Sequence, residues 1–266
     1  MRMRKTAPLL VLLASVCVII YTGPKLLMAE QVYREGNSAY FALREQVKKS
    51  AQDELFEPTP QASAVSTKGT AAEEAPAGAP AFEIDHEALR ALNEDAAAWL
   101  YCPNTAIDYP VMRADDYNYY LYHLPDGTQN ANGSLFIDYN CAADFSDELT
   151  VVYGHNMKSG HMFGSLKRYK EQRYFDENPY MYLFTRKGNY RIELLYGCVI
   201  GAEQWRERAF MYAENIDALI AYAAHNTTFI SGAEYAGGDR IAAMSTCSYE
   251  FDGARYVIIG VLRGEE

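Results

Sequence analysis

Residues 240–262 read R-I-A-A-M-S-T-C-S-Y-E-F-D-G-A-R-Y-V-I-I-G-V-L, which is two apolar runs of strand length with a polar stretch between them. The polar stretch contains Asp252-Gly253, a pair that is typical of tight turns. Together these features predict a β-hairpin close to the C-terminus. A cysteine, Cys247, and an arginine, Arg255, flank its polar stretch.

The register of this hairpin has two alternatives. A two-residue turn at Asp252-Gly253 pairs Glu250 with Arg255 in an ordinary cross-strand ion pair. A wider loop, of about seven residues, places Arg255 opposite Cys247 instead. The residue pattern alone does not choose between these registers.

Further runs upstream also have the composition of short strands, with Gly, Asn, Asp and Pro between them. They are A-I-D-Y-P-V-M, S-L-F-I-D-Y, L-T-V-V-Y-G-H, Y-M-Y-L-F-T and Y-R-I-E-L-L-Y-G-C-V-I. Seven or eight strands with few helices predict a mainly β fold, one closed or nearly closed barrel decorated by helices.

Three segments after the first 80 residues are predicted to be helical. Asp85 is a suitable N-cap for residues 86–100, H-E-A-L-R-A-L-N-E-D-A-A-A-W-L, in which Trp99 is a candidate packing residue. The other two are insertions between strands, S-L-K-R-Y-K-E-Q at 165–172 and N-I-D-A-L-I-A-Y-A-A-H-N at 215–226.

The N-terminus predicts a transmembrane signal anchor. Residues 1–5, M-R-M-R-K, are basic, and residues 6–24 carry no charge. A helix of the uncharged residues spans roughly 28 Å, close to the hydrocarbon thickness of about 30 Å. We therefore expect a cytoplasmic tail at 1–5, an anchor at 6–28 and the rest of the chain outside the cell. A cleaved signal peptide, ending near Leu27-Met28-Ala29, is the competing interpretation.

Three regions are expected after the anchor. Residues 29–57 are predicted to form a juxtamembrane helical segment that is broken near Gly36-Asn37. Residues 58–81 are rich in Pro, Ala, Ser and Thr, which predicts a flexible linker that holds a domain away from the membrane. The folded domain is then expected at 82–266.

The composition argues against two kinds of site. A formal charge of −11 over 266 residues argues against nucleic-acid binding as the main activity. The five cysteines are Cys17, Cys102, Cys141, Cys198 and Cys247. They form no C-x-x-C pair, and the loop carboxylates have no recognised ligand spacing, so we expect no metal and no cofactor. Two disulfides outside the membrane remain arithmetically possible.

Two residues at predicted strand ends are candidates for chemistry. His155 follows the run L-T-V-V-Y, and Cys247 ends the run I-A-A-M-S-T-C. Functional side chains are often held at the ends of rigid strands. A thiol beside a histidine and an arginine has the surroundings of a nucleophile. The alternative is a buried, structural Cys247, and His161 is the competing histidine.

The motifs G-H-N-M around His155, S-T-C at 245–247 and the Arg255 strand resemble the signature of the sortases, cysteine transpeptidases of Gram-positive cell surfaces. The segments I-D-Y-P-V, D-Y-N-Y-Y-L and G-S-L-F-I-D-Y are similar to those of class B sortases. The resemblance covers roughly residues 82–263. It implies a sortase-type β-barrel of seven or eight strands with an N-terminal helix and helical insertions.

By position, the resemblance implies Cys247 as nucleophile, His155 as general acid/base and Arg255 as the group that orients substrate and steadies the oxyanion. It also favours the wide loop, with Arg255 facing the thiol. Residues beside the nucleophile are expected to bind substrate, and these are Met244, Ser245, Thr246, Tyr249 and Asn156.

The implied reaction is cleavage of a C-terminal sorting signal, of N-P-x-T-G or N-P-Q-T-N type, after its Thr. A thioester then passes the surface protein to an amine of a cell-wall precursor or, in some members, of a pilin. The expected location is the cell membrane, with a single span, the N-terminus inside and the catalytic domain outside. The alternatives are a pilin-polymerising sortase, a cysteine hydrolase on the same scaffold and a non-catalytic surface binding module.

Overall fold

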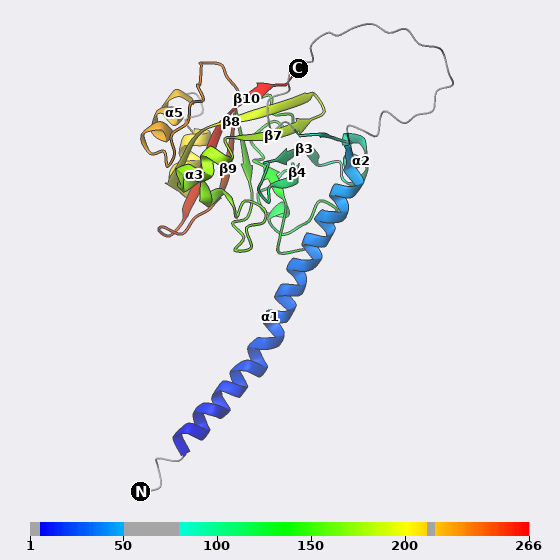
Figure 1. The fold of residues 1–266 in the computed structure, drawn as a ribbon, viewed down its shortest axis with the longest axis vertical. Helices are drawn as coiled ribbons and strands as arrows, with labels where there is room; N and C mark the ends of the chain where they lie inside the picture. Colours follow the sequence, from blue (N-terminus) through cyan, green and yellow to red (C-terminus); the bar gives the residue numbers. More distant parts are fainter. Residues whose placement is uncertain (1–5, 51–79, 212–215, 266) are drawn as a thin grey trace, which may run out of the picture.

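The computed structural model describes residues 6–50, 80–211 and 216–265, and its centre is a closed barrel of strands in the order β10-β8-β7-β3-β4-β5-β6-β9 (Figure 1). The strands are β3 (Ala96–Tyr101), β4 (Asp108–Met112), β5 (Leu135–Ile137), β6 (Leu149–Tyr153), β7 (Tyr180–Thr185), β8 (Gly188–Gly201), β9 (Ile241–Cys247) and β10 (Ala254–Gly264). Neighbouring strands are antiparallel except in two parallel pairs, β4–β5 and β6–β9. The predicted mainly β barrel is confirmed.

The strands of the C-terminal hairpin are apolar on both faces because both faces are covered. Residues from all eight strands, among them Met244 and Ile258, form one buried cluster, which is the interior of the barrel. The intervening residues of β9 and β10, such as Ala243 and Val257, lie in a second cluster with the helical insertion. A strand that is buried on both sides has the near-continuous apolar run seen in the sequence.

The helical insertion that covers this outer face follows β8. It begins with α4 (Ala202–Arg206), continues as one π-helical turn, η4 (Glu207–Met211), and ends with α5 (Ile216–His225). Trp205 of α4 and Leu219 of α5 are buried against the barrel. The other predicted insertion forms a 3-10 helix, η3 (Leu166–Lys170), followed by α3 (Gln172–Glu177).

Helix α2 (His86–Leu92) is shorter than expected. Asp85 is its N-cap, as predicted, and the Asp85 carboxylate accepts a hydrogen bond of 2.9 Å from the backbone N–H of Ala88. The residues expected to continue the helix form strand β3, in which Trp99 is fully buried and donates from Nε1 to Asp108 Oδ1 at 2.8 Å. The helix prediction over 93–100 is wrong because strand pairing and burial of Trp99 outweigh the helix propensity of three alanines.

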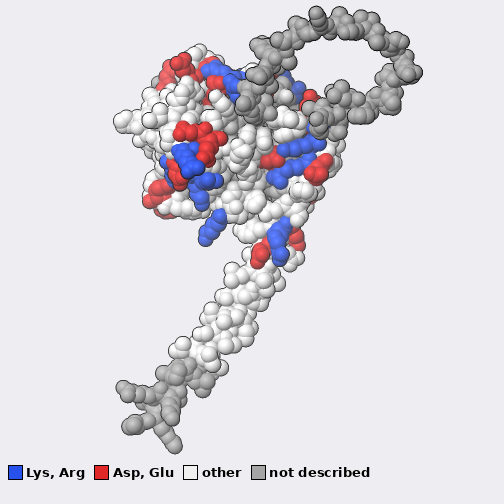
Figure 2. Space-filling model, in the orientation of Figure 1, with Lys and Arg blue, Asp and Glu red and all other residues white. Residues whose placement is uncertain are grey.

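Helix α1 (Thr6–Val47) is continuous, so the predicted break near Gly36-Asn37 is wrong. Its outer part is exposed and is long and apolar enough to cross a membrane, and the face of it seen in Figure 2 is largely uncharged. Its last turns pack on the barrel through the buried side chains of Tyr40, Leu43 and Val47. Gly36 lies in the helix where a loop of the barrel approaches closely, which explains a glycine there without a break.

Strand β1 (Lys48–Ser50) follows α1 directly and pairs antiparallel with β2 (Phe82–Ile84). The predicted linker 58–81 lies between these strands, and its residues 58–79 are outside the described part of the chain. Because Ser50 pairs with Phe82, the two ends of the intervening segment are held together beside the barrel. The length of that segment therefore does not set the separation between α1 and the barrel.

Candidate active site

Strands β9 and β10 place Cys247 and Arg255 directly opposite each other, as Cα partners at the end of their ladder. The loop between the strands is wide, and the predicted register with Arg255 facing Cys247 is confirmed. Glu250 lies in this loop and forms an ion pair with Lys170 of η3 instead. The alternative register, with Glu250 opposite Arg255, is wrong.

Strands β6 and β9 bring His155 to the same end of the barrel. They run parallel, and their last paired residues are Tyr153 and Ser245. His155 lies two residues after Tyr153, and Cys247 lies two residues after Ser245. The parallel pairing thus delivers the histidine beside the cysteine although the two are far apart in sequence.

Two hydrogen bonds join the C-terminal ends of β6 and β9. The Thr246 hydroxyl donates to the carbonyl oxygen of Gly154 at 2.7 Å and is buried. Just beyond the ladder, Nδ2 of Asn156 donates to the carbonyl oxygen of Cys247 at 2.7 Å. The backbone on either side of the thiol is therefore tied to the loop that carries the histidine.

One hydrogen bond defines the tautomer of His155. Its Nε2 atom lies 2.7 Å from the carbonyl oxygen of Leu121, the last residue of η2 (Tyr119–Leu121). A carbonyl oxygen only accepts, so Nε2 carries the hydrogen, and Nδ1 is the nitrogen that takes up and releases a proton. His161 contacts Ser159 Oγ at 3.1 Å and does not line the cavity described next.

A cavity of about 470 Å³ opens over Cys247, His155 and Arg255. The Cys247 side chain is exposed, whereas the histidine and the arginine are half-buried. The other residues that line the cavity are Tyr117, Asn118, Leu121, Tyr122, Phe136, Tyr153, Gly154, Ala202, Trp205, Arg206, Ser245 and Thr246. Aromatic walls with a few polar groups are typical of a binding cleft.

All five cysteines are free, and their surroundings differ. Burial raises the pKa of Cys102 and of Cys141 to about 11 and that of Cys198 to about 12. These three buried thiols stay protonated and unreactive near neutral pH. Cys247, in contrast, is exposed and lines the cavity at the end of the barrel.

The residues predicted to bind substrate are placed differently from one another. Ser245 and Thr246 line the cavity. Met244 is fully buried in the barrel interior, and Tyr249 is 76% exposed in the β9–β10 loop, so neither contributes to the cavity lining. Asn156 contacts the backbone of the thiol residue and is outside the lining as well.

One wall of the cavity comes from residues that sequence reasoning did not single out. Tyr117 donates to Asp138 Oδ1 at 3.2 Å, and Tyr153 donates to Asp138 Oδ2 at 2.9 Å. Burial, and then the buried Asp138 carboxylate, raise the pKa values of both tyrosines, so the hydroxyls stay protonated donors. Trp205 and Arg206 of α4 complete this wall. The signal in the sequence was the Tyr-rich segment D-Y-N-Y-Y-L.

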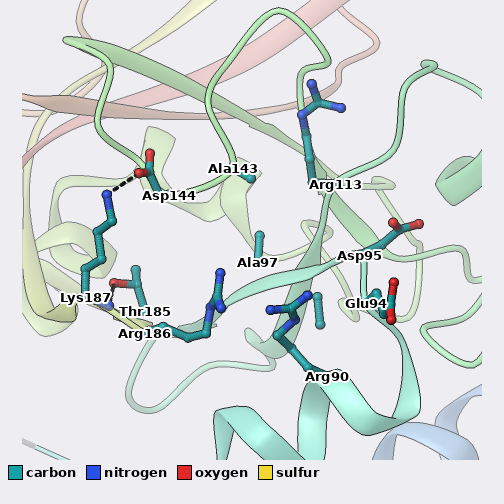
Figure 3. Close-up of a pocket in the computed structure, with 11 residues that line it drawn as sticks. Arg90, Glu94, Asp95, Ala97, Arg113, Ala143, Asp144, Thr185, Arg186 and Lys187 are labelled. Carbon is teal, nitrogen blue, oxygen red and sulfur yellow. Dashed lines mark hydrogen bonds and ion pairs between the residues drawn. The ribbon is translucent and has the colours of Figure 1, made fainter.

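A second cavity, of about 570 Å³, shares no lining residue with the first (Figure 3). Arg90, Arg186 and Lys187 lie on one side of it, and Lys187 forms an ion pair with Asp144. Neither a cysteine nor a histidine is among its lining residues. The arrangement therefore offers no nucleophile and no general base of the kind that the first cavity contains.

Comparisons with known proteins identify relatives of this chain. No family model matches it. Sortase B of Listeria monocytogenes is 31% identical over 177 residues, which cover 65% of this chain and 72% of that protein. Sortase B of Staphylococcus aureus is 21% identical over 176 residues, with the same coverage.

Solved structures agree with the sequence comparison. The structure of Clostridium perfringens sortase B matches with a TM-score of 0.62 and 26% identity, covering 66% of this chain and 98% of that one. A Staphylococcus aureus sortase B–substrate complex shares the fold, with a TM-score of 0.63 and 21% identity, over 68% of this chain and 85% of that one. Together with the Listeria relative, these matches show that the chain belongs to the class B sortases, a family of cysteine transpeptidases.

Proposed function

We propose that this sortase is anchored in the cell membrane and cleaves a C-terminal sorting signal of N-P-x-T-G or N-P-Q-T-N type after its Thr. It then transfers the surface protein to an amine of a cell-wall precursor. The observation that carries the proposal is the juxtaposition of Cys247, Arg255 and His155 at one end of the barrel, over one cavity.

In the first half of the reaction, the sulfur of Cys247 attacks the carbonyl carbon of the substrate Thr, and the proton of the thiol passes to Nδ1 of His155. The carbonyl electrons move onto oxygen, and the guanidinium of Arg255 stabilises this oxyanion. The tetrahedral intermediate collapses, the C–N bond breaks, and His155 gives a proton to the departing amine. The product of this half is a thioester between Cys247 and the Thr of the surface protein.

In the second half, the acceptor amine attacks the thioester carbonyl. His155 takes a proton from the amine as the new amide bond forms, and it returns this proton to the sulfur of Cys247 as the C–S bond breaks. No oxidant, reductant or metal takes part in either half. The charge that develops lies on one oxygen at a time, which suits a single arginine opposite the nucleophile.

The proposed anchor is the outer part of α1. This helix is near the N-terminus, and its apolar part is long enough to cross a membrane and is not buried against the rest of the described structure. The basic residues 1–5 precede it and favour an N-terminus on the cytoplasmic side. The barrel would then lie at the outer surface, where the sorting signals and the acceptor amines are found.

The direct test uses the full chain in detergent micelles with a panel of sorting-signal peptides, with and without a small amine. We expect cleavage after Thr by the natural chain, and an amide adduct when the amine is present. Cys247→Ala should abolish both products, whereas Cys17→Ser, which alters another exposed cysteine, should leave them unchanged.

Absence of cleavage by the natural chain, or equal cleavage by Cys247→Ala, would overturn the proposal. A free Thr carboxylate in place of the amide adduct, at saturating amine, would instead indicate a cysteine hydrolase. A pilin-derived lysine that outcompetes cell-wall amines would indicate a pilin-polymerising enzyme.

A further inference from the structure

The carbonyl oxygen that holds His155 is itself held from both sides. The backbone N–H of Ser134 donates to the carbonyl of Tyr120 at 2.8 Å, and the N–H of Asn130 donates to the carbonyl of Tyr122 at 2.8 Å. These bonds flank Leu121, whose carbonyl accepts the hydrogen of His155 Nε2. The position of the imidazole therefore depends on where the segment 130–134 lies.

Gly133 brings this segment into direct contact with the same carbonyl. Its φ angle is +56°, in the left-handed region that favours glycine. A Cβ atom at this position would lie 2.5 Å from the carbonyl oxygen of Leu121 and 2.7 Å from that of Tyr120. The segment 130–134 therefore packs closely against the backbone carbonyl that orients the histidine.

Helix α1 holds one end of the segment. Asn130 Nδ2 donates to the carbonyl of Val32 at 3.0 Å, and Asn132 Nδ2 lies 3.2 Å from Asn37 Oδ1. Both asparagines are buried, and both lie against Gly36. A Cβ atom at Gly36 would lie 2.7 Å from Asn130 Oδ1 and closer still to Asn132 Nδ2. Because glycine has no Cβ atom, the side chains of the two asparagines can pack against the helix at this position.

Tyr40, one helical turn after Gly36, holds the other end. Its hydroxyl donates to the carbonyl of Gly133 at 2.6 Å and lies 3.1 Å from Ser134 Oγ. The side chain is 2% exposed, and its ring meets that of Tyr109 edge-on at 5.0 Å. Burial raises the pKa of Tyr40, so the hydroxyl remains a protonated donor.

We propose that Gly36 and Tyr40 of α1 are positioning residues for His155, because they fix the segment 130–134, which fixes the Leu121 carbonyl, which selects the Nε2–H tautomer of the imidazole. This inference rests on the role proposed above for His155. The N-terminal helix is then part of the catalytic machinery's support as well as an anchor.

A matched pair of substitutions on α1 tests the proposal in the full chain. Gly36→Ala adds a methyl group where the two asparagines dock, and Gly23→Ala adds the same group where nothing lies within 4 Å. Both changes replace a helical glycine with alanine. We expect Gly36→Ala to lower kcat about tenfold to a hundredfold, the scale expected of a small misplacement of a catalytic group, and Gly23→Ala to leave it unchanged.

Histidine side-chain NMR, with nitrogen-15 labelling and the signal assigned through His155→Gln, reads the tautomer without any substrate. For the neutral imidazole we expect one Nε2–H tautomer in the natural chain and in Gly23→Ala, and a mixture of tautomers in Gly36→Ala. A change in stability alone would not alter the tautomer of the folded protein.

Tyr40→Phe is the second variant, and it decides the question if Gly36→Ala does not fold. It keeps the ring packing and removes the hydroxyl that contacts Gly133 and Ser134, so a tautomer mixture and a lower kcat are again expected. An Nε2–H tautomer and kcat equal to the natural chain in the folded variants would overturn the proposal. A natural chain without transpeptidase activity would overturn the proposed function instead, since the tautomer test still applies.

Discussion

Arg255 stands across the β9–β10 ladder from Cys247, and not from Glu250, which is nearer to it in sequence. In this register the guanidinium and the thiol project from neighbouring positions at the rim of one cavity. The side chain of Glu250 is drawn away to Lys170. Arg255 is thus left without a carboxylate partner among the described residues. Its Nη1 donates to the carbonyl oxygen of Ala254 at 3.1 Å, and its remaining donors are available to a substrate.

The first prediction concerns the shape of the Arg255 side chain. Arg255→Lys keeps the charge but replaces a planar fork of donors with a single ammonium group. We expect kcat for peptide cleavage to fall about a hundredfold or more in Arg255→Lys, as when an oxyanion donor is removed. In Arg255→Ala, kcat should fall at least as far. Steady-state kinetics on one sorting peptide measure both.

Glu250→Gln serves as the comparison for the arginine variants, because the other register would make this glutamate the partner of Arg255. A loss of kcat in Glu250→Gln as large as that in Arg255→Lys would contradict the assignment of Arg255 to the substrate. So would full activity of Arg255→Lys.

The second prediction concerns the reactivity of the thiols. A charged thiol-reactive sulfonate should modify Cys247 in the folded chain within minutes, while Cys102, Cys141 and Cys198 react only after denaturation, because burial raises their pKa values. Mass spectrometry of the digested protein locates the adducts. Modification of a buried cysteine before Cys247 would refute the assignment.

The third prediction separates two neighbouring hydroxyl groups of β9. Thr246→Val removes the buried donor to Gly154 and leaves that carbonyl unpaired, which should cost about 1–3 kcal/mol of unfolding free energy. Ser245→Ala removes a buried hydroxyl that has no hydrogen-bond partner in the described part of the chain, so its cost should be below about 0.5 kcal/mol. Urea unfolding measures both, and equal costs would contradict the hydrogen-bond assignment.

The fourth prediction concerns the pH dependence of the β9–β10 loop. Burial opposes ionisation of Glu250, but the hydrogen bonds from Lys170 and Ser248 outweigh it and lower the pKa of the carboxyl to about 2 from its ordinary value of 4.5. A carboxyl whose pKa is lower in the folded protein than in the unfolded chain stabilises the fold at pH values above its unfolded-state pKa. This stabilisation is lost as the pH falls from about 4.5 toward 2.

Thermal unfolding of Glu250→Gln should reveal this contribution. The side chain is 40% exposed, so we expect a Tm lower by no more than about 3 °C at pH 7. The difference should shrink as the pH is lowered through 4. Asp252→Asn, in the same loop, is the control and should leave Tm unchanged at pH 7. A difference for Glu250→Gln that grows on acidification would contradict the ion pair.

Much of the fold was predictable because strand runs and turn residues are local signals. The apolar runs of the barrel, the N-cap at Asp85 and the helical insertions all follow from short patterns. The segment A-A-A-W-L misled because its helix propensity is local, whereas its pairing with β4 and β7 depends on strands elsewhere in the chain. The continuity of α1 through Gly36 likewise depends on a loop nearly a hundred residues later.

The candidate site was predictable only in part. His155, Cys247 and Arg255 were visible as chemically distinctive residues at strand ends. The group that orients the histidine is a backbone carbonyl, that of Leu121, and no residue type marks it in a sequence. The cavity wall of Tyr117 and Trp205 required the fold, because the segment before η2 and helix α4 are far apart in sequence and line one cavity only in the folded chain.

The uninterrupted helix α1 has a consequence for where this enzyme works. Between Met28 and Tyr40 a helix rises roughly 18 Å at about 1.5 Å per residue, and Figure 1 shows the β9–β10 loop on the side of the barrel toward the first turns of α1. With α1 as the proposed anchor, the continuous helix holds the barrel at a fixed distance from the bilayer, whereas a flexible linker would let that distance vary. Its reach is then limited to sorting signals and acceptors still close to the bilayer, so the enzyme would act on proteins as they emerge.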